Sequence, residues 1–194
     1  MKVKKGIVAA ITAAINAMAN VSAQAATPIG MVQLTNRYEI ECRDKNGKLK
    51  WTEVIEESLV VNAGLDDSLD KHLKGSAYTA AWYVGLTDGT PTVAAADTMS
   101  SHAGWAEVTA YSESVRQTLT LGTVSSQSVD NSASKAVFSI NGTATVGGCF
   151  ITTNNTKGGT SGTLYGAGAF SGGDKSVTSG DVLNVTVTCT AAAS

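Results

Sequence analysis

The sequence predicts a mainly β protein: a jelly-roll-like β-sandwich with one short helix after an N-terminal hairpin, plus an N-terminal helical appendage. Three observations support this fold class. The 194 residues suffice for one ordinary domain with a short addition. Small residues dominate, with 27 Ala, 20 Gly, 19 Ser and 24 Thr. Short apolar runs, separated by turn residues about every ten positions, favour strands over helices.

The first element of the domain is a β-hairpin over residues 37–56. Tyr38, Ile40 and Cys42 share one face of an alternating run, and the alternation resumes at Leu49 and Trp51. The intervening Asn46-Gly47 is typical of a tight hairpin turn, because both residue types tolerate positive φ.

A helix is predicted over residues 58–74. Leu59, Ala63, Leu69 and Leu73 fall on one helical face, and Gly75 is a natural stop. Because Gly64 interrupts the pattern, a shorter helix that begins near Leu65 is the alternative.

The rest of the chain predicts strands. In the last of them, Leu183, Val185, Val187 and Cys189 face one way. Strands this short, with a turn after each, are typical of a β-sandwich. The predicted segments are residues 81–86, 113–120, 135–140, 143–146, 149–153, 164–170 and 182–190.

Residues 1–27 form a separate segment before a single β-rich domain over residues 28–194. Lys2, Lys4 and Lys5, an apolar run and an A-x-A pattern that ends at Ala25 fit a secretory signal peptide cleaved after Ala25. A second interpretation fits almost as well, because several apolar residues recur at helical spacing, which indicates an amphipathic arm that docks onto a partner. The contact residues of that arm would be Ile7, Ile11, Ile15 and Met18.

Composition excludes several classes of function. The formal net charge is −2, so no basic excess is available to neutralise a phosphate backbone, and nucleic acid is not an expected partner. The apolar run near the start is too short to span a membrane, so we expect no membrane partner for the mature protein. Of the 30 charged residues, 23 lie at or before Glu113.

No catalytic constellation is recognisable, and we expect no enzymatic activity, cofactor or metal. The chain contains no G-x-S-x-G elbow and no Walker lysine loop. His102 lacks a recognisable base and orienting partner. Asp66, Asp67 and Asp70 lack the spacing of a calcium loop. Glu107 and Glu113 could flank a sugar, but two carboxylates in a chain with 16 acidic residues are expected by chance.

The cysteines and the large aromatic residues allow alternatives. Cys42, Cys149 and Cys189 are read first as buried free thiols, with a Cys149–Cys189 bridge as the alternative in an exported protein. The aromatic side chains could line a carbohydrate platform, although core or subunit-interface positions fit their apolar strand context better. The candidate interface aromatics are Trp82, Tyr83 and Trp105.

Several runs resemble a family of small proteins encoded by tailed bacteriophages. The most distinctive is residues 96–105, Ala-Asp-Thr-Met-Ser-Ser-His-Ala-Gly-Trp. Others are residues 36–39, 50–51, 59–65, 81–86, 129–138 and 154–159. The resemblance covers roughly Pro28 to the end, and residues 1–27 look added. It implies a virion structural protein, plausibly a capsid decoration or cement protein, and carries over no catalytic residues.

The resemblance also implies partners. A decoration protein would bind the major capsid protein and copies of itself, with a trimer at a threefold lattice point as one arrangement. Its localisation would be the virion. A tail- or fibre-associated protein that recognises the host is one alternative. The other is a secreted bacterial carbohydrate-binding or adhesion β-sandwich, which cleavage after Ala25 would favour.

Overall fold

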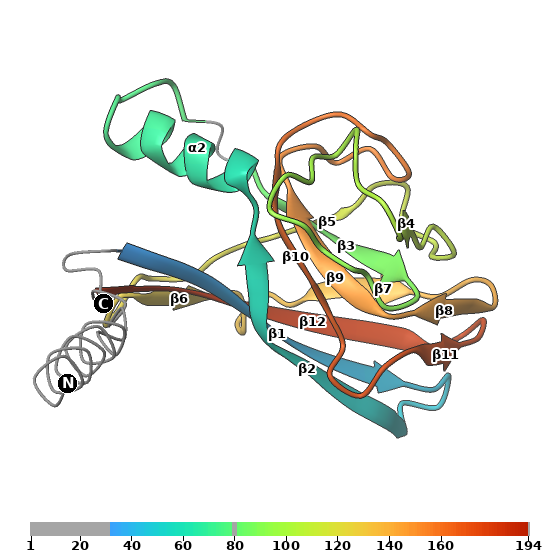
Figure 1. Cartoon of the computed structure of the whole chain (residues 1–194). Helices are drawn as coiled ribbons and strands as arrows, with labels where there is room; N and C mark the ends of the chain where they lie inside the picture. Colours follow the sequence, from blue (N-terminus) through green and yellow to red (C-terminus); the bar gives the residue numbers. More distant parts are fainter. Residues whose placement is uncertain (1–31, 79–80, 194) are drawn as a thin grey trace, which may run out of the picture. The chain divides into compact units, whose positions relative to one another are not determined.

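Antiparallel strands dominate the described chain, which confirms the mainly β prediction. The computed structural model describes residues 32–78 and 81–193 (Figure 1). The chain divides into two units, Gln33–Ala192 and a second made of Met1–Val32 with Ala193–Ser194. The predicted appendage, residues 1–27, and its contact residues lie outside the described residues.

The predicted hairpin is confirmed. It is formed by β1 (Val32–Arg43) and β2 (Leu49–Val60), which pair antiparallel. The turn closes because the Asp44 carboxylate accepts the backbone N–H groups of Asn46 and Lys48, each at 2.9 Å, and Gly47 takes φ +79°. The alternation of β1 puts Tyr38, Ile40 and Cys42 in the core.

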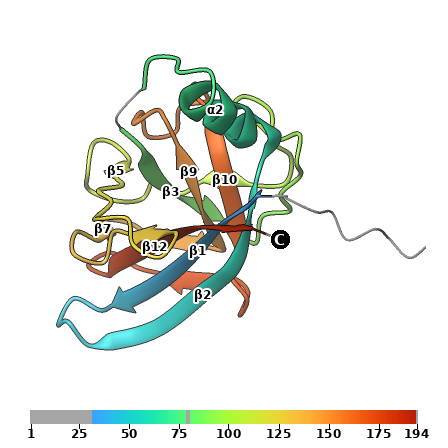
Figure 2. The same ribbon diagram turned by 90° about the vertical axis from the view of Figure 1, so that its left-hand side faces the viewer.

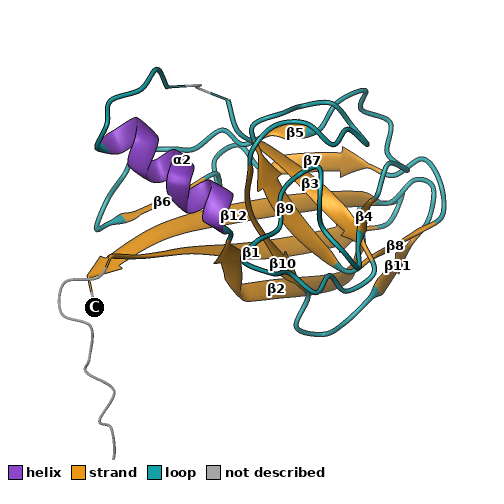
Figure 3. Ribbon diagram, turned by 45° about the horizontal axis from the view of Figure 1, so that its top comes forward, coloured by secondary structure: helices purple, strands orange, loops and turns teal. Residues whose placement is uncertain are grey.

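The strands join in a curled antiparallel sheet with the order β4-β3-β9-β10-β2-β1-β12-β6, and β5 and β7 add to β3 and β12. Figure 3 shows β1, β12 and β6 running side by side. A separate pair joins β8 to β11. The remaining strands are β3 (Tyr83–Asp88), β4 (Ala106–Glu107), β5 (Gln117–Thr118), β6 (Ser128–Asp130), β7 (Ala136–Ser139), β8 (Ala144–Val146), β9 (Gly148–Thr152), β10 (Leu164–Ala169), β11 (Lys175–Val177) and β12 (Val182–Ala193).

Six of the seven later strand predictions match a strand of similar extent. The strand predicted over residues 113–120 is wrong in extent, because only β5 forms there. The reason is local: Val115 makes an isolated bridge with Thr156, and the side chain of Arg116 turns into the protein.

β2 joins two halves of the sheet: β1, β12 and β6 form the first half, and β10, β9, β3 and β4 form the second. It pairs with β1 up to Ser58 and then with β10 through Leu59 and Val60. The curl encloses a core to which both halves contribute, with Tyr38, Phe138 and Leu183 fully buried. A smaller cluster around Val61, Met99, Trp105, Phe150 and Leu164 covers the other face of β9 and β10.

β9 is the centre of the second half and is buried along its whole length. Ile151 and Cys149 point into the large core, and Phe150 points into the small one. Gly85 lies opposite Phe150, where an added Cβ would collide with the Phe150 ring. A continuous apolar run therefore marks a strand that is covered on both faces.

The helix is shorter than the sequence predicts. α2 spans Asn62–His72 and packs against β10 (Figure 2), while residues 58–60 belong to β2. The alternative start near Leu65 is also wrong, because Gly64 lies inside the helix, where an added Cβ would collide with the Tyr165 carbonyl oxygen. The predicted apolar face is not buried: Leu69 is 56% exposed and Leu73 is 81% exposed.

Candidate docking groove

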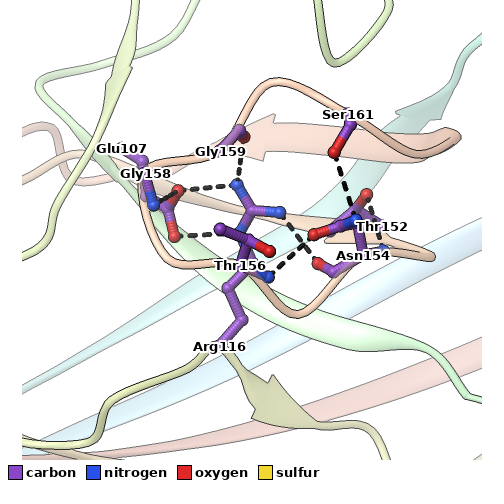
Figure 4. A network of polar contacts seen from close by, with 8 residues as sticks. All are labelled: Glu107, Arg116, Thr152, Asn154, Thr156, Gly158, Gly159 and Ser161. Atoms are coloured by element: carbon purple, nitrogen blue, oxygen red, sulfur yellow. Dashed lines mark hydrogen bonds and ion pairs between the residues drawn. The ribbon is translucent and has the colours of Figure 1, made fainter.

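Two regions of the domain hold unusual side chains: a buried ion pair and an apolar groove. In the ion pair, Arg116 is fully buried and faces Glu107 (Figure 4). Arg116 Nε donates to Glu107 Oε1 at 3.0 Å, and Nη2 donates to Oε2 at 2.7 Å. This two-pronged geometry is among the stronger hydrogen-bonded contacts in proteins.

The rest of the guanidinium holds a loop. Arg116 Nη1 donates to the Asn154 carbonyl at 2.8 Å, and Nη2 donates to the Gly159 carbonyl at 2.6 Å. Glu107 in turn accepts the backbone N–H of Gly158 at 2.7 Å. Because these contacts occupy both carboxylate oxygens and all three guanidinium nitrogens, we assign the pair a structural role as a clasp on residues 154–159.

Arg116 was not among the residues that the sequence singled out. A signal for it was available, since Arg116 is the first of only seven charged residues after Glu113. The Glu107 and Glu113 carboxylates both have structural partners, because Glu113 accepts the backbone N–H of Ser139 at 3.1 Å and Glu107 holds Arg116.

The groove lies between α2, the start of β1, the end of β12 and the segment that leads into β6. We call it the α2 groove. Its volume is about 550 Å³, within the range of natural ligand pockets. Most of its lining is apolar. The lining includes Leu34, Asn36, Asp67, Ser68, Lys71, Tyr78, Trp82, Leu119, Leu121, Val124, Gln127, Tyr165 and Cys189.

Apolar side chains at the groove remain open to solvent. Val124 is 70% exposed and Tyr78 is 62% exposed, and Leu121 also reaches the surface. Scattered exposed apolar residues are ordinary, but their concentration around one concavity is typical of an interaction surface.

An aromatic pair lies in the lining of the groove, formed by Trp82 just before β3 and Tyr165 on β10. Trp82 stands edge-on to Tyr165 with ring centroids 5.1 Å apart, and both line the groove. Asn36 is buried there, opposite Ser58 on β2. The Asn36 Nδ2 has no hydrogen-bond partner among the described residues, which is the arrangement that ordered water commonly satisfies.

The cysteines are all free thiols, as the first interpretation of the sequence has it. Cys189 lines the groove, and burial raises its pKa to about 11. Burial also raises the pKa of Cys42 to about 11, with the Asp181 carboxylate adding to the effect. A thiol with such a pKa is protonated at neutral pH and is a weak nucleophile.

Two further buried carboxylates are paired. Burial raises the pKa of Asp181, but the ammonium of Lys50 at 2.5 Å and the backbone N–H of Thr178 outweigh it and hold the pKa below its ordinary value. Burial likewise raises the pKa of Glu53, but the Lys175 ammonium and the backbone N–H of Gly172 outweigh it and hold that pKa below its ordinary value. Among residues 32–78 and 81–193, no group of three or more His, Cys, Asp or Glu side chains could hold a metal ion.

The candidate aromatic residues do not gather at one site. Trp82 lines the groove, and Tyr83 is half-buried on β3. Trp105 is buried in the small core, where His102 stacks on it at 3.7 Å between ring centroids and Phe150 lies 5.2 Å away. The structure thus places one candidate aromatic at the groove. The proposed arm contacts Ile7, Ile11, Ile15 and Met18 lie outside the described residues.

No family model matches the chain, and no curated protein matches it. In the part of the chain that the structure describes, no helix is long and apolar enough to cross a membrane.

Proposed function

We propose that this chain is a non-enzymatic structural protein of a phage virion, and most specifically a capsid decoration protein that binds and stabilises the outer shell. The observation that carries the proposal is the α2 groove, an apolar concavity with exposed Val124 and Tyr78 beside it. A surface of this kind suits binding to protein better than it suits catalysis, because its lining includes no activated nucleophile.

The form of the domain supports the same proposal. We propose that the curled sheet is a jelly-roll-like β-sandwich, since both halves contribute to one core. Two buried ion pairs and the Arg116 clasp hold its loops. A rigid body that contacts several shell subunits at once, as a homo-oligomer, gains affinity without any strong single contact.

The alternatives make different demands. A carbohydrate-binding β-sandwich needs exposed aromatic faces, and Trp105 is buried. A tail or fibre protein would be present at low copy number.

Quantitative mass spectrometry of purified phage particles tests the proposal: a copy number of the same order as the major capsid protein supports it. A few copies per particle would move the protein to the tail, and absence would contradict a virion role.

A binding experiment then tests the groove. Leu121→Asp places a charge in the groove, and Leu49→Asp does the same at the turn end of the hairpin, where Leu49 is also exposed. We expect at least a tenfold loss of binding to decoration-free particles for Leu121→Asp and little change for Leu49→Asp, with both variants folded. Equal binding by the two variants would show that the groove plays no part in attachment to the shell.

A further inference from the structure

Within residues 32–78 and 81–193, no segment fully covers the apolar surface of the α2 groove. Leu119, Trp82 and Tyr165 line its inner part, and Leu121, Val124 and Tyr78 remain open around it. An occupant must therefore present a continuous apolar stripe to recover the free energy of burying this area.

The charges of the groove wall restrict the occupant further. Lys71 is already engaged, since its ammonium donates to the Ala77 carbonyl at 2.8 Å and lies 3.7 Å from Asp70. Asp67 lines the groove and makes no ion pair with any described residue. The wall therefore favours an occupant with cationic groups beside its apolar stripe.

The chain itself carries such a sequence. Residues 7, 11, 15 and 18 are Ile, Ile, Ile and Met, and their spacing fits one stripe of a helix about 16 Å long. Lys2, Lys4 and Lys5 lie beyond one end of that stripe, and the first acidic residue in the chain is Glu39. The apolar stripe is complementary to the apolar lining of the groove, and the lysines are complementary in charge to Asp67.

We propose that residues 2–18 of one copy of this chain occupy the α2 groove of a second copy. The choice of a second copy rests on the proposed function, in which the protein acts as a homo-oligomer. Residues 19–31 link the stripe to β1 and can extend over about 40 Å, which is long enough to reach a neighbouring protomer. Each copy gives one arm and receives another, so the exchange can close into a symmetric ring.

Cys189 provides a direct test, because its thiol lines the groove. In the full chain, Ile11→Cys places a thiol on the apolar stripe. Ala13→Cys places one about 200° away around the predicted helix. Under mild oxidation we expect Ile11→Cys to give disulfide-linked dimers and higher ring-sized species on non-reducing gels, at least tenfold more than Ala13→Cys. Adding Cys189→Ser should abolish them.

Four results would overturn the proposal. One is equal cross-linking by Ile11→Cys and Ala13→Cys, and another is no Cys189-dependent cross-link in either variant. The third is a Cys189-dependent disulfide confined to single chains, seen as loss of two thiols without a dimer band. Intact mass must show residues 2–18 present, and cleavage after Ala25 in purified particles would also contradict the arm.

A charge exchange gives a second readout in the full chain. Asp67→Lys should shift the oligomer toward the monomer in sedimentation by about tenfold in dissociation constant, and Lys4→Glu added to it should restore part of the loss. Retained cooperative unfolding shows that each variant is folded. These measurements use purified protein, whereas the proposed function is tested by the copy number in phage particles. A negative result here would therefore contradict the arm exchange without contradicting the proposed function.

Discussion

The Arg116 clasp and the α2 groove differ in how they treat polarity: the clasp buries a charged side chain, and the groove exposes apolar side chains. At the clasp, a charged side chain is buried, and every nitrogen of its guanidinium has an acceptor within 3.0 Å. At the groove, apolar side chains stay exposed although the surrounding body is well packed. The clasp is complete within the described residues, whereas the apolar side chains of the groove have no full cover among those residues.

The difference separates stability from binding. A buried ion pair is costly to desolvate, so it persists only where its hydrogen bonds are all satisfied. An exposed apolar surface weakens no single chain but invites association. Changes at the clasp should therefore lower the free energy of unfolding, and polar changes in the groove should mainly lower affinity for a partner.

The largest effect is expected at the clasp. Arg116→Met leaves the Glu107 carboxylate buried without its partner, and we expect a loss of about 3–5 kcal/mol in the free energy of unfolding. Urea denaturation with an unchanged slope measures it.

Two controls sharpen this prediction. Arg37→Met removes a surface cation that pairs with Glu39 and Glu56, and should cost no more than about 1 kcal/mol. Arg116→Met combined with Glu107→Leu should recover part of the loss, because no unpaired charge remains. A loss below about 1 kcal/mol for Arg116→Met alone would show that the clasp is not a stabilising element.

The next largest effect concerns the attachment of α2. Gly64→Ala favours the helix by about 1 kcal/mol of intrinsic propensity, yet its Cβ would collide with the Tyr165 carbonyl oxygen. We expect a net loss of about 1–3 kcal/mol, with faster amide hydrogen exchange in α2. Leu69→Ala, on the exposed face, should change stability by less than about 0.5 kcal/mol. Unchanged exchange in α2 for Gly64→Ala would contradict the close packing.

Local patterns predicted the hairpin and most strands, because the physics that sets them is local. The Asn46-Gly47 turn and the alternation through Tyr38 and Ile40 specify the hairpin within about twenty residues of chain. The continuous apolar run of β9 and the alternation of β12 also matched their burial. Gly75, the predicted stop, takes φ +75° just beyond the helix.

Long-range contacts explain what the patterns missed. The helix contains Gly64 because β10 passes directly beneath it, and β10 lies about one hundred residues further along the chain. Arg116 is buried because Glu107 and the loop at Asn154 meet around it. The α2 groove depends on the order of β1, β12 and β6, which no single segment encodes. The position of the groove therefore could not be predicted from any local pattern in the sequence.

The ion pair between Asp181 and Lys50 is less buried than the Arg116 clasp. Asp181 is buried, but the side chain of Lys50 is 31% exposed. Because contacts in the folded state lower the pKa of Asp181, their stabilisation is present above the unfolded pKa near 4 and is lost as the pH falls through the folded value. The free energy of unfolding should therefore be nearly constant near neutral pH and should decline below about pH 4.

Asp181→Asn isolates this contribution. We expect a loss of about 1.5 kcal/mol at pH 7, smaller than that of Arg116→Met, and a shallower decline in acid. Asp66→Asn, at an exposed helix position, should change stability at pH 7 by less than about 0.5 kcal/mol. An acid decline as steep in Asp181→Asn as in the unaltered protein would assign the pH dependence to other carboxylates, with Glu53 the first to test.

The smallest effect is expected at the edge of the groove. Ser126 and Gln127 take φ values of +49° and +58° in the two-residue turn between Ser125 and Ser128, although neither is glycine. Left-handed backbone costs roughly 1–2 kcal/mol for each ordinary residue, and Asn-Gly is the pair that such turns favour. Ser126→Asn with Gln127→Gly should therefore raise the free energy of unfolding by about 0.5–1 kcal/mol.

Thermal unfolding measures this gain as a rise of about 1–4 °C in the midpoint. Gly47→Ala is the matched reversal, since Gly47 also has positive φ and open space around it, and it should lower stability by about 1 kcal/mol. A fall in stability for the Asn-Gly variant would mean that the Ser126 or Gln127 side chain contributes more than the backbone strain costs. Because Gln127 lines the groove, weaker self-association in a stabilised variant would show that the turn is shaped for its occupant.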